Sequence, residues 1–134
     1  MGKVKITTIG LILVLAILCR LCISDTEEHP LGRGFNYSEY TESIYYWRYG
    51  DSLHFSIPPR VLSYDNRWSS IIIKQQPELF DDPMFSHYDY PYGRDSVYYW
   101  YINKKSKEIT GPVLYSEMEC FLEEKGLEGT LKKL

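Results

Sequence analysis

The stretch that decides the fold is residues 97–127, VYYWYINKKSKEITGPVLYSEMECFLEEKGL. Its first six residues are valine, isoleucine, tyrosine and tryptophan, which pack well on a pleated strand. The polar run 103–107 predicts a turn. Residues 108–110 predict a short return strand that ends at Gly111-Pro112, because proline cannot donate a ladder hydrogen bond. The stretch therefore predicts a hairpin that closes a small sheet.

After Pro112 the hydrophobic period changes from two residues to about 3.6, which predicts a helix. Ser116, followed three residues later by Glu119, predicts a capping box, and Gly126 suits the left-handed residue that ends a helix. A helix of about ten residues is marginal alone in water, so we expect it to dock on the sheet. The stripe that would dock contains Met118, Phe121, Leu122 and Lys125.

Residues 1–24 have the pattern of a secretion signal, with two lysines before the apolar run 6–19. As a helix this run would span about 21 Å, short of the hydrocarbon core of about 30 Å. We therefore predict cleavage near Asp25 and export to the cell envelope or periplasm. The alternatives are an uncleaved membrane anchor and lipidation at Cys19 or Cys22, and the membrane would be a partner only through such an N-terminus.

Removing residues 1–24 takes away three basic residues and no acidic one, so the net charge changes from −3 to −6. An acidic chain without a lysine and arginine stripe argues against nucleic acid and anionic membrane surfaces as partners. Only Cys120 remains of the three cysteines, so no internal disulfide is expected. Its place opposite Met118 on the helical wheel predicts an exposed or flanking side chain that is passive, with a disulfide between two chains as the alternative.

The rest of the chain reads as one domain at 35–134 after a polar tether at 25–34. Further strand segments are predicted at residues 35–40, 43–49, 53–57, 61–64 and 68–74. The continuous apolar run 71–73 is typical of a central strand that is covered on both faces. Residues 78–95 show no period and predict a long loop. We therefore expect an α+β domain, a five- to six-stranded antiparallel meander sheet with one C-terminal helix packed on it.

Three stretches resemble the bacterial secreted proteins of domain-of-unknown-function family 3997. They are Leu31-Gly32-Arg33-Gly34-Phe35; Ile57-Pro58-Pro59-Arg60-Val61, continuing to Tyr64 and to Ile72-Ile73-Lys74-Gln75; and Tyr99-Trp100-Tyr101-Ile102, continuing to Gly111-Pro112-Val113. With their spacing they cover nearly all of the chain after residue 24. The resemblance implies secretion and a shared fold, and the family has no assigned chemistry to carry over.

A shorter resemblance covers only the closing unit. Gly111-Pro112-Val113, then Met118, Phe121 and Gly126, is similar to the GYF domain, which binds proline-rich peptides on an aromatic platform. Leu127-Glu128 stands where that domain has an aromatic pair. Binding of proline-rich peptides is therefore an alternative function.

The residues that could carry chemistry follow no catalytic or metal-binding motif. Five titratable side chains lie in the predicted loop: Asp81, Asp82, His87, Asp89 and Asp95. They lack the spacing of a known calcium loop, so a solvated acidic loop is the simpler interpretation and no metal or cofactor is expected. No nucleophile elbow selects a triad. A small envelope hydrolase stays an alternative, and it would require His54 or His87 beside a carboxylate in a pocket.

Aromatic residues are unusually frequent, with 13 tyrosines and three tryptophans in 134 residues. Tyrosine and tryptophan are common in binding hot spots, although alternate members of each strand could simply form the core. We predict a non-enzymatic binding module that takes a protein, peptide or glycan on an aromatic surface beside the 78–95 loop. The candidate binding residues are Tyr88, Tyr90, Tyr92, Tyr99 and Tyr101.

Overall fold

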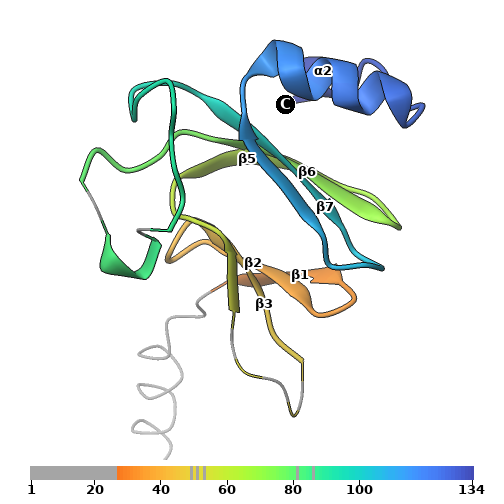
Figure 1. The fold of residues 1–134 in the computed structure, drawn as a ribbon. Helices are drawn as coiled ribbons and strands as arrows, with labels where there is room; N and C mark the ends of the chain where they lie inside the picture. Colours follow the sequence, from red (N-terminus) through yellow and green to blue (C-terminus); the bar gives the residue numbers. More distant parts are fainter. Residues whose placement is uncertain (1–26, 49, 51, 53, 81, 86) are drawn as a thin grey trace, which may run out of the picture.

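The computed structural model describes residues 27–134 apart from residues 49, 51, 53, 81 and 86. It is an α+β fold with two four-stranded antiparallel sheets and one C-terminal α-helix (Figure 1). The predicted class, the antiparallel pairing and the C-terminal helix are confirmed. The signal segment predicted at 1–24 lies outside the described residues. None of the helices in the described part of the chain has the length and apolar character needed to span a bilayer.

The eight strands fall into two sheets, each ordered as in the sequence. The first sheet contains β1 (Glu28–Gly32), β2 (Phe35–Ser38), β3 (Ser43–Tyr46) and β4 (His54–Ile57). The second contains β5 (Val61–Asn66), β6 (Ser70–Gln75), β7 (Tyr98–Asn103) and β8 (Ile109–Val113). The prediction of one five- to six-stranded sheet is wrong, because the chain leaves the first sheet after β4. Pro58 and Pro59 cannot donate ladder hydrogen bonds, and Arg60 turns the backbone with a φ of 67°.

Strand β1 corrects the prediction of a tether at 25–34. A two-residue turn, Arg33-Gly34, has positive φ at both positions, as hairpin turns that match the twist of antiparallel strands require. The turn folds β1 back on β2, and Leu31 is buried in the core. Only this one side chain of β1 is buried, so the polar composition concealed the strand.

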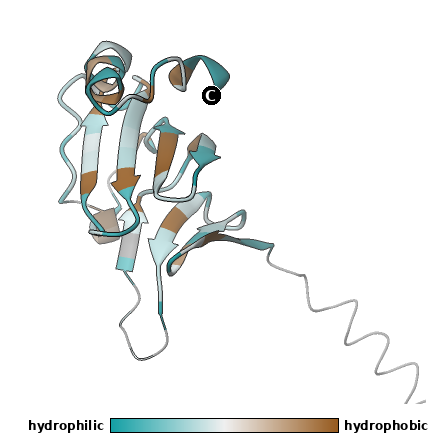
Figure 2. Ribbon diagram, turned by 90° about the vertical axis from the view of Figure 1, so that its right-hand side faces the viewer, coloured by the Kyte–Doolittle hydropathy of each residue, from teal (hydrophilic) through white to brown (hydrophobic). Residues whose placement is uncertain are grey.

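The core between the two sheets draws apolar side chains from seven of the eight strands. It contains Leu31, Phe35, Ile44, Tyr46, Ile57, Val61, Ile71, Ile73, Trp100 and Ile102. Hydrophobic residues accordingly recur along the strands of both sheets, whereas the turns are mostly hydrophilic (Figure 2). Ile72 faces the other side of β6 and packs under the helix, so the predicted burial of residues 71–73 on both faces is confirmed.

Helix α2 (Tyr115–Glu124) covers the outer face of the second sheet, beside the short 3-10 helix η2 (Leu131–Lys133). Met118 and Leu122 are buried against Tyr99 and Tyr101, and Phe121 packs at their edge, as the predicted stripe requires. The sheet therefore has a covered face on each side, one under the first sheet and one under α2.

The predicted C-terminal cap of α2 is confirmed, whereas the predicted capping box at its N-terminus is wrong. The helix begins after Leu114, whose backbone N–H donates to Glu117 Oε2 at 3.0 Å, so the predicted Ser116–Glu119 box does not form. The helix starts two residues earlier than predicted: its N-cap is Leu114, and the glutamate three residues after it is Glu117. At the other end Gly126 has a φ of 70°, and Leu127 N–H bonds to Leu122 O at 2.8 Å, which is the expected C-terminal cap.

Candidate functional site

The connection between β6 and β7 spans residues 76–97, and its described residues contain no strand and one 3-10 helix, η1 (Pro83–Phe85). Three of its aromatic side chains tie it to the core. Phe85 is buried, and the Tyr88 ring meets Trp100 edge to face with centroids 5.1 Å apart. The Tyr88 hydroxyl donates to Ser56 O on β4 at 3.0 Å, and the Tyr90 ring lies 5.1 Å from that of Tyr98. The loop is therefore anchored at both sheets.

A second set of contacts fixes the shape of the loop itself. Arg94 Nη1 donates to the carbonyl oxygens of Glu78 and Phe80 at 2.9 and 3.2 Å, so it joins the two arms of the loop. The Tyr98 hydroxyl accepts from Tyr92 N–H and donates to Gly93 O, each at 2.9 Å. These bonds hold the backbone without help from the outward side chains.

The loop exposes large apolar side chains as well as charged ones. Four of the apolar ones are exposed: Leu79 by 63%, Phe80 by 82%, Met84 by 59% and Tyr92 by 53%. We call these four residues the loop patch. Four large apolar side chains exposed within one loop make that loop a candidate surface for association. The hydrogen-bonded parts of the loop, at Glu78, Phe80 and residues 92–94, have less conformational entropy to lose on binding.

The surroundings of the loop patch are acidic. Glu78, Asp82, Asp89 and Asp95 are exposed, whereas the one arginine of the loop, Arg94, is bound to backbone oxygens. Burial raises the pKa of Tyr88, Tyr90 and Tyr98, and the nearby charges of Asp89 and Asp95 raise that of Tyr98 further. The anchoring hydroxyls therefore stay protonated, and able to donate, well above neutral pH.

The structure separates the five tyrosines that the sequence placed on one surface. Tyr88 and Tyr90 are half-buried anchors, and Tyr92 belongs to the loop patch. Tyr99 and Tyr101 are 7% and 8% exposed and lie under α2, because alternate side chains of β7 point to opposite faces of the sheet. Sequence reasoning also missed Leu79, Phe80 and Met84. The only sequence feature that pointed to these residues was the lack of a helical or strand hydrophobic period in residues 78–95.

A separate cleft of about 410 Å³ contains His54. His54 Nε2 lies 3.3 Å from Ser52 Oγ, and Ser56 and Lys107 also line the cleft. Hydrolysis by a serine nucleophile needs a third group, usually a carboxylate, to orient the histidine. Among the described residues that line this cleft there is no aspartate or glutamate. His87 lies against the Tyr88 ring at a centroid distance of 4.1 Å, outside this cleft.

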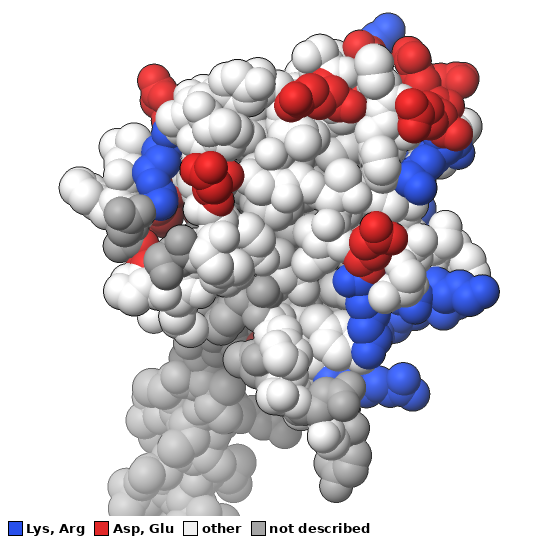
Figure 3. Space-filling model, in the orientation of Figure 1, with Lys and Arg blue, Asp and Glu red and all other residues white. Residues whose placement is uncertain are grey.

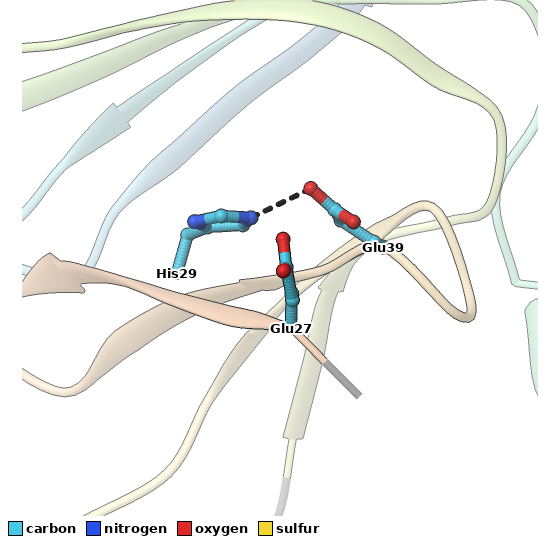
Figure 4. Close-up of side chains that lie close together, drawn as sticks. All are labelled: Glu27, His29 and Glu39. Carbon is cyan, nitrogen blue, oxygen red and sulfur yellow. Dashed lines mark hydrogen bonds and ion pairs between the residues drawn. The ribbon is translucent and has the colours of Figure 1, made fainter. Parts of the chain in front are cut away.

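Within the part of the chain that the structure describes, the residues that come nearest to a metal site are Glu27, His29 and Glu39 (Figure 4). Their ligand atoms all lie within 4.8 Å of one another, and His29 Nε2 is 2.7 Å from Glu39 Oε1. Two carboxylates and one imidazole are a donor set that zinc accepts. Both side chains of the close pair are about half exposed, and the hydrogen bond between them accounts for the short distance. The loop carboxylates Asp82, Asp89 and Asp95 form no comparable group with other described residues, and Asp81 lies outside them.

Comparison of the chain with protein-family models, with curated proteins and with solved structures finds no match.

Proposed function

We propose that the protein is an exported, non-enzymatic binding module that holds a protein partner on the loop patch. The observation that supports it is the combination of a hydrogen-bonded, core-anchored loop with four exposed apolar side chains. Export is supported by the signal pattern of residues 1–24. The acidic surroundings favour a partner that presents basic side chains around an apolar contact.

The proline-rich peptide alternative has less support. It rests on the unit that contains Gly111-Pro112-Val113 and α2. In this unit Val113 and Leu127 pack against the cluster under the helix, so they contribute to the domain's own core.

A photocrosslinking experiment tests the proposal. A benzophenone amino acid replaces Phe80 in one variant and Tyr40 in another. Both side chains are 82% exposed, and Tyr40 follows β2, outside the loop. We expect a discrete protein adduct from position 80 and none from position 40, in cells that produce the full chain. Adducts in equal amount from both positions, or none from position 80, would contradict the proposal.

The captured protein is then purified and titrated with the full chain. The double variant Phe80→Ser, Met84→Ser should bind it at least about tenfold more weakly, because anchor side chains of an interface contribute more than about 1 kcal/mol each. Its urea midpoint should not change, since both side chains are exposed. Tyr40→Ser is the control and should bind normally. Affinity should also fall as salt rises, because the surrounding carboxylates would face basic side chains.

A further inference from the structure

A second cleft, of about 470 Å³, lies at the end of the sheets remote from the loop patch. It opens between the β1–β2 turn, the β5–β6 turn and the β7–β8 turn, and Arg33, Arg67, Trp68 and Lys104 line it. Lysine and arginine side chains gather at this edge, on the right of Figure 3, although the chain as a whole is acidic. We call it the basic cleft. Its volume is in the range of small-molecule sites.

Lys104 is a buried charge without an opposite charge. Its side chain is almost fully buried, and Nζ donates to Leu31 O, Asn66 Oδ1 and Arg67 O. All three acceptors are neutral oxygens, and no carboxylate of the described residues lies within ion-pair distance of Nζ. Burial, and then the charge of Arg33, lower the pKa of Lys104. The three donors of Nζ are all used, so its hydrogen bonding is complete while its charge has no counter-charge. Buried charges in proteins are normally paired, so an anion in the cleft would balance this charge without a direct bond to Nζ.

Arg33 adds a second cation that is held in an unfavourable backbone conformation. It has a φ of 54° between two glycines that also have positive φ. Hairpin turns of this kind favour asparagine or glycine, which occupy the left-handed region more easily. Among the described residues the Arg33 guanidinium has no ion-pair partner. Strain kept at a cleft is a reason to look for a function there.

The third cation is only partly neutralised, and an aromatic ring stands beside it. Arg67 Nε bonds to Asp65 Oδ2 at 2.9 Å, and Nη2 bonds to Thr130 Oγ1 at 2.9 Å. Trp68, the next residue, is 88% exposed and lines the cleft. The cleft is therefore lined by three cations, of which only Arg67 has a carboxylate partner, and by an indole ring that is exposed to solvent. Guanidinium groups bind carboxylates and phosphates, and an indole face stacks on the apolar face of a sugar ring.

We propose that the basic cleft binds an acidic saccharide, with its anionic group beside Arg33 and Lys104 and a sugar ring against Trp68. This site goes beyond the proposed protein-binding loop and does not depend on it. The buried charge of Lys104 accounts for the anion, and the exposed Trp68 accounts for the sugar. Arg33 would contact the ligand directly, whereas the Nζ of Lys104, with its three bonds, would act through its electric field.

Calorimetric titration of the full chain tests this assignment with defined probes. They are the trimer of galacturonic acid, the neutral galactose trimer and inorganic phosphate. We expect the acidic trimer to bind at least about tenfold more tightly than either of the others. No binding of the acidic trimer would overturn the proposal. Equal affinity for the neutral trimer would overturn the role of the anion, and equal affinity for phosphate would overturn the role of the sugar.

Two arginine variants separate binding from folding. Arg33→Gly removes the guanidinium and suits the positive φ, so it should fold at least as well as the parent and bind about tenfold to a hundredfold more weakly. Arg33→Asn is a second variant that the turn accepts. The matched control is Arg60→Gly, because Arg60 also has positive φ, 67°, and does not line the cleft. Unchanged affinity in Arg33→Gly, or an equal loss in Arg60→Gly, would overturn the proposal.

Trp68→Ala tests the stacking contact separately. The side chain is almost fully exposed, so its removal should leave the urea midpoint unchanged. We expect a loss of affinity of about tenfold for the acidic trimer, since stacking of an aromatic ring contributes a hot-spot contact. Full retention of affinity would overturn the placement of the sugar ring.

Discussion

Gln75 is the buried residue that joins the loop to the sheets, and replacing it by leucine should destabilise the fold strongly. Its side chain is fully buried on β6. Gln75 Oε1 accepts from Trp100 Nε1 at 2.8 Å, and Nε2 donates to Pro59 O at 3.0 Å and to the Tyr90 hydroxyl at 3.3 Å. One amide thus connects β7, the β4–β5 junction and the loop.

The expected magnitude follows from the groups that Gln75→Leu leaves without partners. The indole N–H of Trp100 and the carbonyls of Pro58 and Pro59 would each lose a bond, and those at Trp100 and Pro58 are buried. A buried polar group without a partner is unfavourable by about 1–3 kcal/mol. Burial of the leucine side chain offsets about 1 kcal/mol. We expect a net loss of about 3 kcal/mol, a large part of the 5–15 kcal/mol typical of a domain.

Urea unfolding followed by tryptophan fluorescence measures this loss, which should lower the midpoint by about 1–3 M. The control is the neighbouring Gln76→Leu. Gln76 Nε2 makes only a long bond to Asp95 O, at 3.4 Å and exposed, so its loss should stay below about 1 kcal/mol. Adding Trp100→Phe to Gln75→Leu removes the unpaired N–H and should lose less than the two single losses together. If Gln75→Leu is no worse than Gln76→Leu, the reasoning about the buried amide is refuted.

Two further predictions concern backbone space and pH. Gly111→Ala would place a Cβ 2.7 Å from Tyr99 O at a φ of 127°. It should lower the free energy of unfolding, measured with urea, by more than about 2 kcal/mol. The control is Gly126→Ala, which has open space around the added Cβ and should lower it by about 1 kcal/mol. Burial and Glu28 raise the pKa of Tyr45 to about 12, and burial raises that of Tyr98. These phenols bind protons more tightly in the folded state than in the unfolded chain, so their stabilisation is complete below pH 10 and is lost as the pH rises through the folded pKa. The urea midpoint should therefore fall above about pH 10, as tyrosinate absorbance increases. The lowered pKa of Lys104 acts in the opposite direction, so a midpoint that rises there would contradict the prediction that the tyrosines dominate.

The parts of the fold that could be predicted from the sequence are those whose signals are local. The hairpin of β7 and β8 follows from strand preference and a polar turn, and α2 follows from its stripe and Gly126. The assignment of strands to two sheets could not be predicted. Pro58-Pro59 shows that a strand ends, but the next pairing partner depends on contacts between residues far apart. The same limit concealed β1, which is polar except where Leu31 meets the core.

The sequence indicated the loop at 78–95 but not which of its side chains are exposed. Four of the large exposed apolar side chains, those of the loop patch, lie in it. The sequence does not show which of the alternating tyrosines 88, 90 and 92 faces the core. The burial of Tyr88 and Tyr90 depends on hydrogen bonds to Ser56 O and Gln75, which lie on β4 and β6. For Tyr99 and Tyr101 the sequence did contain evidence that they are buried. An amphipathic helix needs a sheet face, and alternate residues of β7 supply it.

The charges of the molecule separate because the two ends of β6 and β7 are connected differently. These strands pair without interruption from Ser70 with Asn103 to Gln75 with Tyr98. At the Gln75 end a long loop has room to expose both carboxylates and apolar side chains. At the Ser70 end short turns from both sheets converge, so Arg33, Arg67 and Lys104, remote in sequence, become neighbours. The acidic net charge therefore does not describe the Ser70 end, and a basic protein partner at one end is compatible with an acidic saccharide at the other. Because no loop-patch residue lines the basic cleft, the binding effects of Phe80→Ser and Arg33→Gly should be independent of each other.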